Sequence, residues 1–447
     1  MEKNLTTGSV FGNIVRFSLP YLFSYFLQTL YGMADLFIIG QYADASGTTA
    51  VSVGSQVMHM LTLMIVGLAM GATVTIGQAV GARDQKSAAR YTGNTMTLFL
   101  VLSVAVTGLL LALARPIAAV MSTPAEAVSG TVAYLRICFL GVPLITAYNI
   151  IASVFRGLGD SKRPMYFIAV ACAVNIALDY LFIGALHMGP AGAALGTTLA
   201  QAVSVAVSLA VMRGARGGIA LTRDDFRPQR AIMGRILRIG VPIALQDVLV
   251  GVSFLVILAI VNSLGLLQSA GMGIAEKVCA FVMLLPSAFS QSVSAFVAQN
   301  TGAAKPDRAK KALRYSVVTS LCISVFVFYF NFFHGDLLAG IFANDRAVIL
   351  EAADYLKAYA IDCLLTSFLF CFVGYFSGLG KTVFVMAQGI LGAFGVRIPV
   401  SFFMSRLPNV RLFYIGLATP CSTVVQVLLC LAYYTHLSRR EKAGPAV

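Results

Sequence analysis

The sequence predicts an all-α polytopic membrane protein, and three observations support that prediction. Of the 447 residues, 58% are hydrophobic and only 11% are charged, with a mean hydropathy of +0.85. Apolar runs of about twenty residues, the length that a helix needs to cross a hydrocarbon core about 30 Å thick, recur along the chain. An internal repeat divides these runs into two equal sets. We therefore expect twelve transmembrane helices, arranged as two pseudo-symmetric six-helix bundles around a central cleft.

Twelve apolar runs follow one another, separated by polar connections. Each is long enough to cross the membrane as a helix that rises about 1.5 Å per residue. The first run is expected to stay in the mature protein, because the polar residues before it lead into a full-length span without a small-residue cleavage site. The expected spans are 17–42, 47–79, 92–114, 128–155, 164–186, 189–212, 236–262, 269–299, 313–334, 350–376, 382–404 and 412–437.

The net charge of +14 arises from basic residues that gather in alternate connections. Arg83, Lys86 and Arg90 follow the second expected span, and the connection between the two halves holds several more arginines. Lys and Arg are enriched in cytoplasmic loops, so this pattern predicts a multi-pass protein of the cell inner (plasma) membrane with both termini in the cytoplasm. The positive charge is then a topology signal, and no nucleic-acid partner is expected.

The internal repeat is visible in two pairs of motifs. FRGLGD at 155–160 matches FSGLGK at 376–381, and QAVGA at 78–82 matches QNTGA at 299–303, both at an offset of 221 residues. Each half contains six spans, so both halves begin on the same side of the membrane and the repeat is parallel. We expect an N-terminal lobe at 1–213, a cytoplasmic linker at 214–235 and a C-terminal lobe at 236–447.

Two carboxylates lie within spans of the first half. Asp35 in the first span and Asp179 in the fifth have no basic residue beside them in the sequence, and a lone charge at bilayer depth is costly unless it serves an ion or a proton. Asn175 lies one helical turn before Asp179 on the same face, and Thr197 lies at a similar depth in the sixth span. Oxygen ligands of these types suit Na⁺, whereas a carboxylate pair in a low dielectric also holds a proton.

The second half works as an internal control for these residues. At an offset of 221, Asn175 corresponds to Val396 and Asp179 to Val400, and Asp35 corresponds to Val256 or Ile257. Aliphatic residues thus meet the packing requirement, which favours an ion site in the first half only. The second half has its own charges, for which we expect a structural network of paired side chains: Asp247, Glu276, Lys277, Asp362 and Arg397.

The paired motifs and the duplicated twelve-span plan resemble the multidrug and toxic compound extrusion (MATE) transporters over nearly the whole chain. The resemblance is to the prokaryotic branch with acidic residues in the N-terminal lobe, whose coupling-ion residues match Asp35, Asn175, Asp179 and Thr197. It implies that Pro20 is a hinge in the first helix. Flexible, aromatic and polar side chains suit a cavity for varied substrates, and the candidates are Gln28, Tyr31, Met33, Tyr134 and Asn149.

The resemblance implies a secondary antiporter that exports amphipathic or cationic compounds in exchange for H⁺ or Na⁺ by alternating access, without a cofactor. The alternative is a lipid-linked precursor flippase of the same superfamily, for which more basic residues would be expected in the central cavity. An intramembrane enzyme is not expected, because the sequence contains no HExxH, GxSxG or Walker motif. We expect a monomer that has membrane lipids and small-molecule substrates as its partners.

Overall fold

The computed structural model describes residues 5–214 and 221–442, and every regular element in these two ranges is a helix. The described residues form two compact units. One unit contains those of Met1–Gly8, Val15–Ala244 and Ala298–Lys305, and the other contains those of Ser9–Ile14, Leu245–Val297 and Pro306–Val447. Part of the predicted linker, 215–220, lies outside the described residues.

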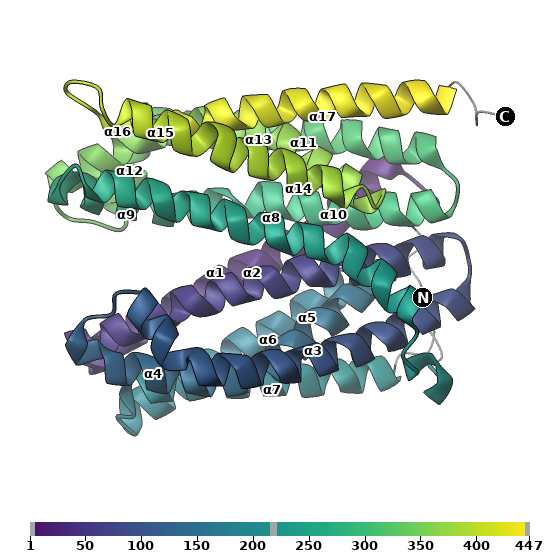
Figure 1. The fold of residues 1–447 in the computed structure, drawn as a ribbon, viewed down its shortest axis with the longest axis horizontal. Coiled ribbons are helices and arrows are strands. Elements are labelled where there is room, and N and C mark those ends of the chain that lie inside the picture. Colours follow the sequence, from purple (N-terminus) through teal and green to yellow (C-terminus); the bar gives the residue numbers. More distant parts are fainter. Residues whose placement is uncertain (1–4, 215–220, 443–447) are drawn as a thin grey trace. The chain divides into compact units, whose positions relative to one another are not determined.

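Figure 1 shows the helices, which occur in the order of the predicted spans. The first half consists of α1 (Val10–Tyr42), α2 (Ala45–Gly81), α3 (Gln85–Val120), α4 (Ala125–Leu140), α5 (Val142–Gly157), α6 (Lys162–Asp179), the π-helix η1 (Tyr180–Ala185) and α7 (Gly189–Gly214). After it come the 3-10 turn η2 (Arg223–Phe226), α8 (Arg230–Asn262), α9 (Leu266–Val282), α10 (Leu284–Gly302), α11 (Pro306–Phe333) and α12 (Gly335–Gly340). The chain continues with α13 (Arg346–Gly378), α14 (Thr382–Ile390), the π-helix η3 (Leu391–Arg397), α15 (Ile398–Met404), α16 (Leu412–Gly416) and α17 (Ala418–Lys442).

The helical segments confirm the predicted number of spans. Within the described ranges, 11 helices are long and apolar enough to cross a membrane, and the bent pair α4 and α5 brings the total to 12. The two helices of this pair meet at Gly141 with a bend of 47°. Pro143, near the start of α5, has no backbone N–H to donate to the preceding turn, which explains why the helix breaks there. The predicted span 128–155 is therefore two helices.

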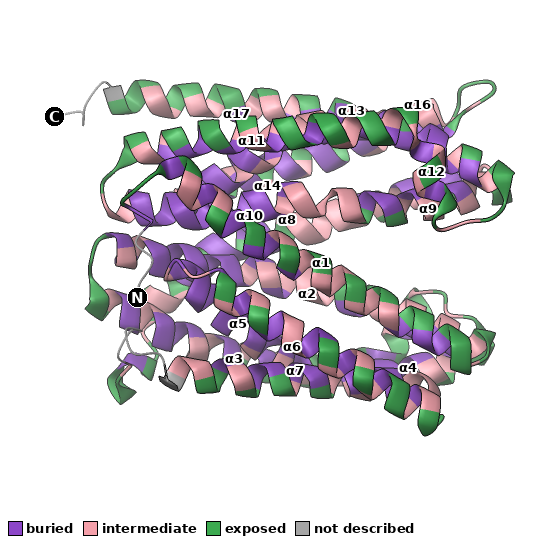
Figure 2. Cartoon of the chain, turned by 180° about the vertical axis from the view of Figure 1, so that it is seen from behind, coloured by how far each residue is buried: buried purple, intermediate pink, exposed green. Residues whose placement is uncertain are grey.

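The interior of each unit is largely apolar, and large apolar side chains also cover much of its outside. In the first unit, Ile38 and Ile39 of α1 are buried in a cluster with Tyr134 of α4, which holds the second half of α1 beside α4. In the second unit, Figure 2 shows exposed residues along α11 and α17, and Val325 and Phe326 of α11 are 54% and 65% exposed. Exposed apolar surface of this kind is expected where lipid is the solvent.

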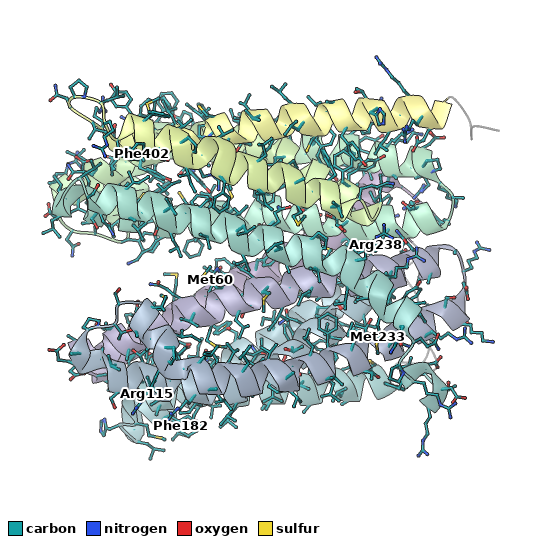
Figure 3. The ribbon with its side chains drawn as sticks, viewed as in Figure 1. Met60, Arg115, Phe182, Met233, Arg238 and Phe402 are labelled. Carbon is teal, nitrogen blue, oxygen red and sulfur yellow. The ribbon has the colours of Figure 1, made fainter. Side chains whose placement is uncertain are left out.

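The ends of the helices in the first unit carry charged residues. Figure 3 shows Arg115 and Phe182 near one end of this unit, whereas Met233 and Arg238 of α8 lie toward the other end. Apolar residues dominate between these ends, and α3 is long and apolar enough to cross a membrane. An apolar middle between charged ends is the distribution that a membrane-spanning helix requires.

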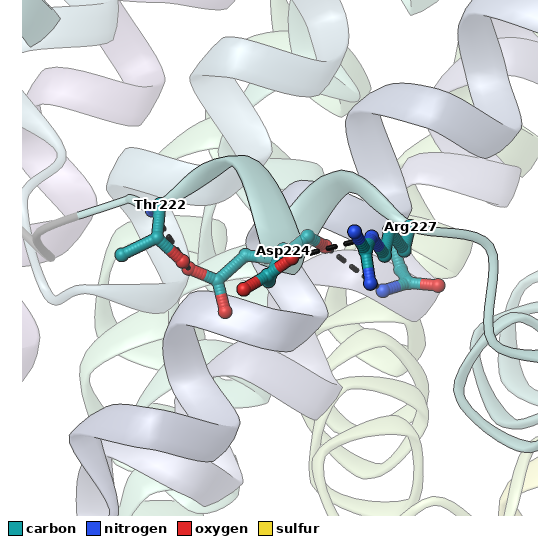
Figure 4. Close-up of polar contacts among 5 residues, drawn as sticks. Thr222, Asp224 and Arg227 are labelled. Atoms are coloured by element: carbon teal, nitrogen blue, oxygen red, sulfur yellow. Dashed lines mark hydrogen bonds and ion pairs between the residues drawn. The ribbon is translucent and has the colours of Figure 1, made fainter.

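The described end of the connection between the halves is folded against α3. In η2, the backbone N–H and the hydroxyl of Thr222 donate hydrogen bonds of 2.8 and 2.7 Å to the carboxylate of Asp225, and Arg227 pairs with Asp224 at 3.2 Å (Figure 4). Asn94 of α3 donates to the backbone carbonyl of Asp225 at 3.0 Å. The turn is therefore fixed before α8 begins.

Candidate functional site

The structure places the predicted acids in the interior of the first unit. Asp35 of α1 is 3% exposed, and Asp179, the last residue of α6, is fully buried. Asp35 Oδ2 accepts a hydrogen bond of 3.2 Å from the hydroxyl of Thr197 on α7. The same hydroxyl lies 3.1 Å from the carbonyl of Ala193, one turn earlier in α7. The single proton of the Thr197 hydroxyl can therefore be donated either to the helix backbone or to the acid.

Asp179 and Asn175 complete the group, because the side chains of both interact with the carboxylate of Asp35. Close approach of α6 and α7 depends on Gly196, where an added Cβ would lie 2.3 Å from Asp179 Oδ1. Gly196 was not predicted from the sequence, although its place immediately before Thr197 in α7 is a usable signal. The structure therefore brings together all four residues proposed for the coupling ion.

Most polar atoms of this group have no hydrogen-bond partner although they are buried. They are Asp35 Oδ1, both carboxylate oxygens of Asp179, and both Oδ1 and Nδ2 of Asn175. No ion pair within the described residues includes Asp35 or Asp179. Buried polar atoms are almost always satisfied, and a buried charge normally has a partner. This concentration of unsatisfied oxygens is suited to hold a proton or a small cation.

The arrangement differs from a transition-metal centre. Nowhere in the described ranges do three or more His, Cys, Asp or Glu side chains form a group that would hold a metal ion. The donors at Asp35 and Asp179 are instead two carboxylates with an amide and a hydroxyl oxygen nearby. Hard oxygen donors fit an alkali cation such as Na⁺.

Two of the proposed cavity residues lie beside the acids. Tyr31, one turn before Asp35 in α1, and Tyr134 of α4 both interact electrostatically with the Asp35 carboxylate. The hydroxyl of Tyr134 is hydrogen-bonded to Ser55 of α2 at 3.1 Å. The hydroxyl of Tyr134 thus links α4 to α2.

The other three cavity candidates have no interaction with the acids among those found in the described residues. Gln28 interacts with the hydroxyl of Tyr148, and Asn149 donates to the carbonyl of Ile145 in its own helix at 2.9 Å. Met33 is 38% exposed, and it lies two residues from Asp35, so the two side chains point to different faces of α1. Tyr148 in turn interacts electrostatically with Tyr31, and the substrate cavity itself stays a prediction.

The proposed hinge residue Pro20 lies buried inside α1, which continues as an α-helix on both sides of it. Proline in a helix interior removes one backbone hydrogen bond. The hydroxyl of Ser24 donates to the Pro20 carbonyl at 2.7 Å, and the guanidinium of Arg156 lies 4.7 Å from the ring centre of Tyr21. The segment around Pro20 is thus held by side-chain contacts, and its role as a hinge stays a prediction.

The expected pairing of charges in the second half is wrong. Among the described residues, no ion pair includes Asp247, Glu276, Lys277, Asp362 or Arg397. Arg397 instead donates to the hydroxyl of Ser253 and lies over the ring of Phe254. The physical reason is spacing: Arg397 and Asp362 interact electrostatically without the close contact of an ion pair.

A comparison with known families confirms the internal repeat. The family model MatE matches this chain twice, over residues 20–181 and 242–403. The two matches begin 222 residues apart and also end 222 residues apart. Each match covers the first five spans of one half.

This register corrects the pairing obtained with a constant offset of 221. A π-helix accommodates one extra residue relative to an α-helix, and η3 lies immediately before the positions in question. With the extra residue placed in η3, the offset becomes 222, as at both ends of the two matches, and pairs Asn175 with Arg397 and Asp179 with Ser401, whereas the same offset near the start of the matches pairs Asp35 with Ile257. The equivalent of the acid site is therefore not wholly aliphatic.

Relatives and solved structures match over nearly the whole chain. Probable multidrug resistance protein YoeA of Bacillus subtilis is 24% identical over 443 residues, covering 97% of this chain and 95% of the relative. Multidrug export protein MepA of Staphylococcus saprophyticus is 26% identical over 404 residues, covering 90% and 88%. A structure described as the outward-facing conformation of a multidrug resistance MATE family transporter has a TM-score of 0.92, at 22% identity and 99% coverage of both chains. With the repeated family match, these findings show that the chain belongs to the MatE family, the MATE transporters.

Proposed function

We propose that this protein is a secondary active antiporter that exports amphipathic or cationic compounds in exchange for H⁺ or Na⁺. The observation that carries the proposal is the pair Asp35 and Asp179, which are buried side by side without a basic partner among the described residues. Relatives named as a probable multidrug resistance protein and a multidrug export protein support the same function. The protein would lie in the inner membrane with both termini cytoplasmic, as two lobes at 1–213 and 236–447.

The coupling follows from competition for charge. Two adjacent carboxylates in a low dielectric cannot both stay ionised without a counter-charge, so a proton or Na⁺ stabilises the pair. Asn175 and Thr197 supply further oxygen atoms, and the Thr197 hydroxyl already reaches Asp35. A cationic substrate that approaches the same carboxylates replaces this counter-charge. Ion and substrate therefore exclude one another.

Exclusive binding drives alternating access when the two ligands favour different conformations. An ion bound from outside shifts the population toward one state, and a substrate bound from inside shifts it toward the other. Tyr31 and Tyr134 lie beside the acids, where aromatic faces attract a cation. Pro20 is the proposed site of bending in α1. No cofactor is required, because the ion gradient supplies the energy.

Reconstituted vesicles test the proposal directly. We expect efflux of a cationic dye when a pH gradient or a Na⁺ gradient is imposed, and applying the gradients one at a time identifies the coupling ion. Asp35→Asn keeps the volume of the side chain but loses its charge, so it should abolish gradient-driven efflux. Asp307→Asn, the same substitution at an exposed position of α11, is the matched control. Normal efflux by folded Asp35→Asn would refute the proposal.

A further inference from the structure

The second half holds a buried cation at a position that corresponds to part of the acid site in the first half. Arg397, at the end of η3, is only 6% exposed and is the equivalent of Asn175 in the repeat. Ser401, one turn later, is fully buried and is the equivalent of Asp179. The duplicated scaffold thus presents acids in one half and a guanidinium with a hydroxyl in the other.

Only some of the N–H groups of the Arg397 guanidinium have a hydrogen-bond partner. Nη1 donates to Ser253 Oγ of α8 at 3.1 Å, and the guanidinium carbon lies 4.4 Å from the ring centre of Phe254. Nε is buried and has no hydrogen-bond partner. Leaving a guanidinium N–H at membrane depth without an acceptor is costly. The buried Nε–H of Arg397 therefore points to a missing hydrogen-bond acceptor.

Neighbouring groups are unsatisfied as well. Ser401 Oγ and Asp362 Oδ1 are buried and have no hydrogen-bond partner. Asp362 of α13 and Tyr355, two turns before it, both interact electrostatically with Arg397. If Arg397 had a purely structural role, Asp362 would be expected to pair with the free edge of its guanidinium. Among the described residues, however, neither Arg397 nor Asp362 takes part in an ion pair.

We propose that these residues form a second binding site, which takes the carboxylate of an amphipathic substrate. This Arg397 cluster consists of Ser253, Phe254, Tyr355, Asp362, Arg397 and Ser401. The planar edge of an arginine side chain that carries Nε matches a carboxylate, and the Ser401 hydroxyl is a further donor. Phe254 and Tyr355 supply aromatic surface, and Asp362 favours a ligand that also carries a positive charge. The cluster therefore selects zwitterionic amphiphiles, which extends the proposed transport function on which this inference rests.

Two dyes that differ in a single carboxylate test the inference. Rhodamine B carries a free carboxylate beside its cationic ring system, and rhodamine B ethyl ester lacks that charge. Their binding to the purified full-length protein is measured by fluorescence polarisation. Loss of a hydrogen bond between charged groups should weaken binding of rhodamine B to Arg397→Gln by about tenfold or more, with the ester changed less than about twofold. Arg397→Lys keeps the charge but loses the fork and should show a smaller loss with the same selectivity.

Arg406→Gln is the matched control, since Arg406 also lies over an aromatic ring, that of Phe402, but is exposed. It should leave the affinity for both dyes unchanged. Wild-type protein provides an independent measurement, in which sodium benzoate at constant ionic strength should displace rhodamine B and not the ester. Equal effects on the two dyes, in the Arg397 variants or in this competition, would overturn the inference. Failure of the proposed export would be seen differently, as absence of gradient-driven efflux of either dye in vesicles.

Discussion

The close packing at Gly196 makes a quantitative prediction. In Gly196→Ala, the new Cβ would lie 2.3 Å from Asp179 Oδ1, whereas ordinary contacts begin at 3.4 Å, so the carboxylate must move by about 1 Å. Overpacking of a helix interface costs about 1–3 kcal/mol. We expect the lower end of this range, because the atom that the new Cβ meets is the end of a side chain and not backbone.

The same displacement should weaken ion binding as well as lower the stability of the fold. A shift of about 1 Å in one ligand, at a cost of about 1 kcal/mol, corresponds to roughly a fivefold loss of affinity for the coupling ion. The assay is the dependence of dye binding on Na⁺ concentration and on pH, measured together with thermal unfolding. Gly108→Ala on α3 is the matched control, since its Cβ would meet no atom within 4 Å. Unchanged ion dependence and unchanged unfolding in Gly196→Ala would refute the reasoning.

Three further predictions concern a hydrogen bond, a titrating turn and the topology. Thr197→Val removes the 3.2 Å hydrogen bond to Asp35 at nearly constant volume, so the affinity for the coupling ion should fall about tenfold or more in a binding titration, and a normal affinity would contradict this role. In η2, hydrogen bonds from the Thr222 backbone and hydroxyl lower the pKa of Asp225. The ionised carboxylate therefore stabilises the fold at pH values above the ordinary carboxyl pKa. This stabilisation is lost as the pH falls through the lowered pKa of Asp225 in the folded protein. Asp225→Asn should therefore unfold at a lower temperature than wild type at neutral pH, with the difference shrinking in acid; a difference independent of pH would contradict the assignment. A reporter fused after Ser438 should be cytoplasmic, and a periplasmic signal would contradict the proposed orientation.

The number of spans and the duplication could be predicted from the sequence because they depend on composition over long windows. Twelve apolar runs and two pairs of motifs can be recognised without knowledge of the local geometry, and the double family match confirms the repeat. The break at Gly141 was missed, because the run 128–155 is continuously apolar and a bend leaves no mark on hydropathy. Pro143 was the available signal.

The acid site was identified from residue type, since a carboxylate within an apolar run is conspicuous. The spacing of Asp35, Asn175, Asp179 and Thr197 allowed their convergence to be predicted, but Gly196 is one of many small residues and is significant only once α6 and α7 are packed together. The offset of 221 taken from two motifs and the offset of 222 at the ends of the family matches give different equivalents in the second half. Only the helical geometry shows the π-helix that adds one residue before Arg397.

The most direct test of the central claim is the ion dependence of substrate binding in Asp35→Asn, Asp179→Asn and the double variant. Binding of a fluorescent cationic substrate to purified wild type should weaken as Na⁺ rises or as the pH falls, and this dependence should flatten in either single variant. Because one shared counter-charge serves both acids, the double variant should bind and transport about as poorly as the worse single variant. Additive losses together with an unchanged ion dependence would contradict the claim that the two acids form one coupling site.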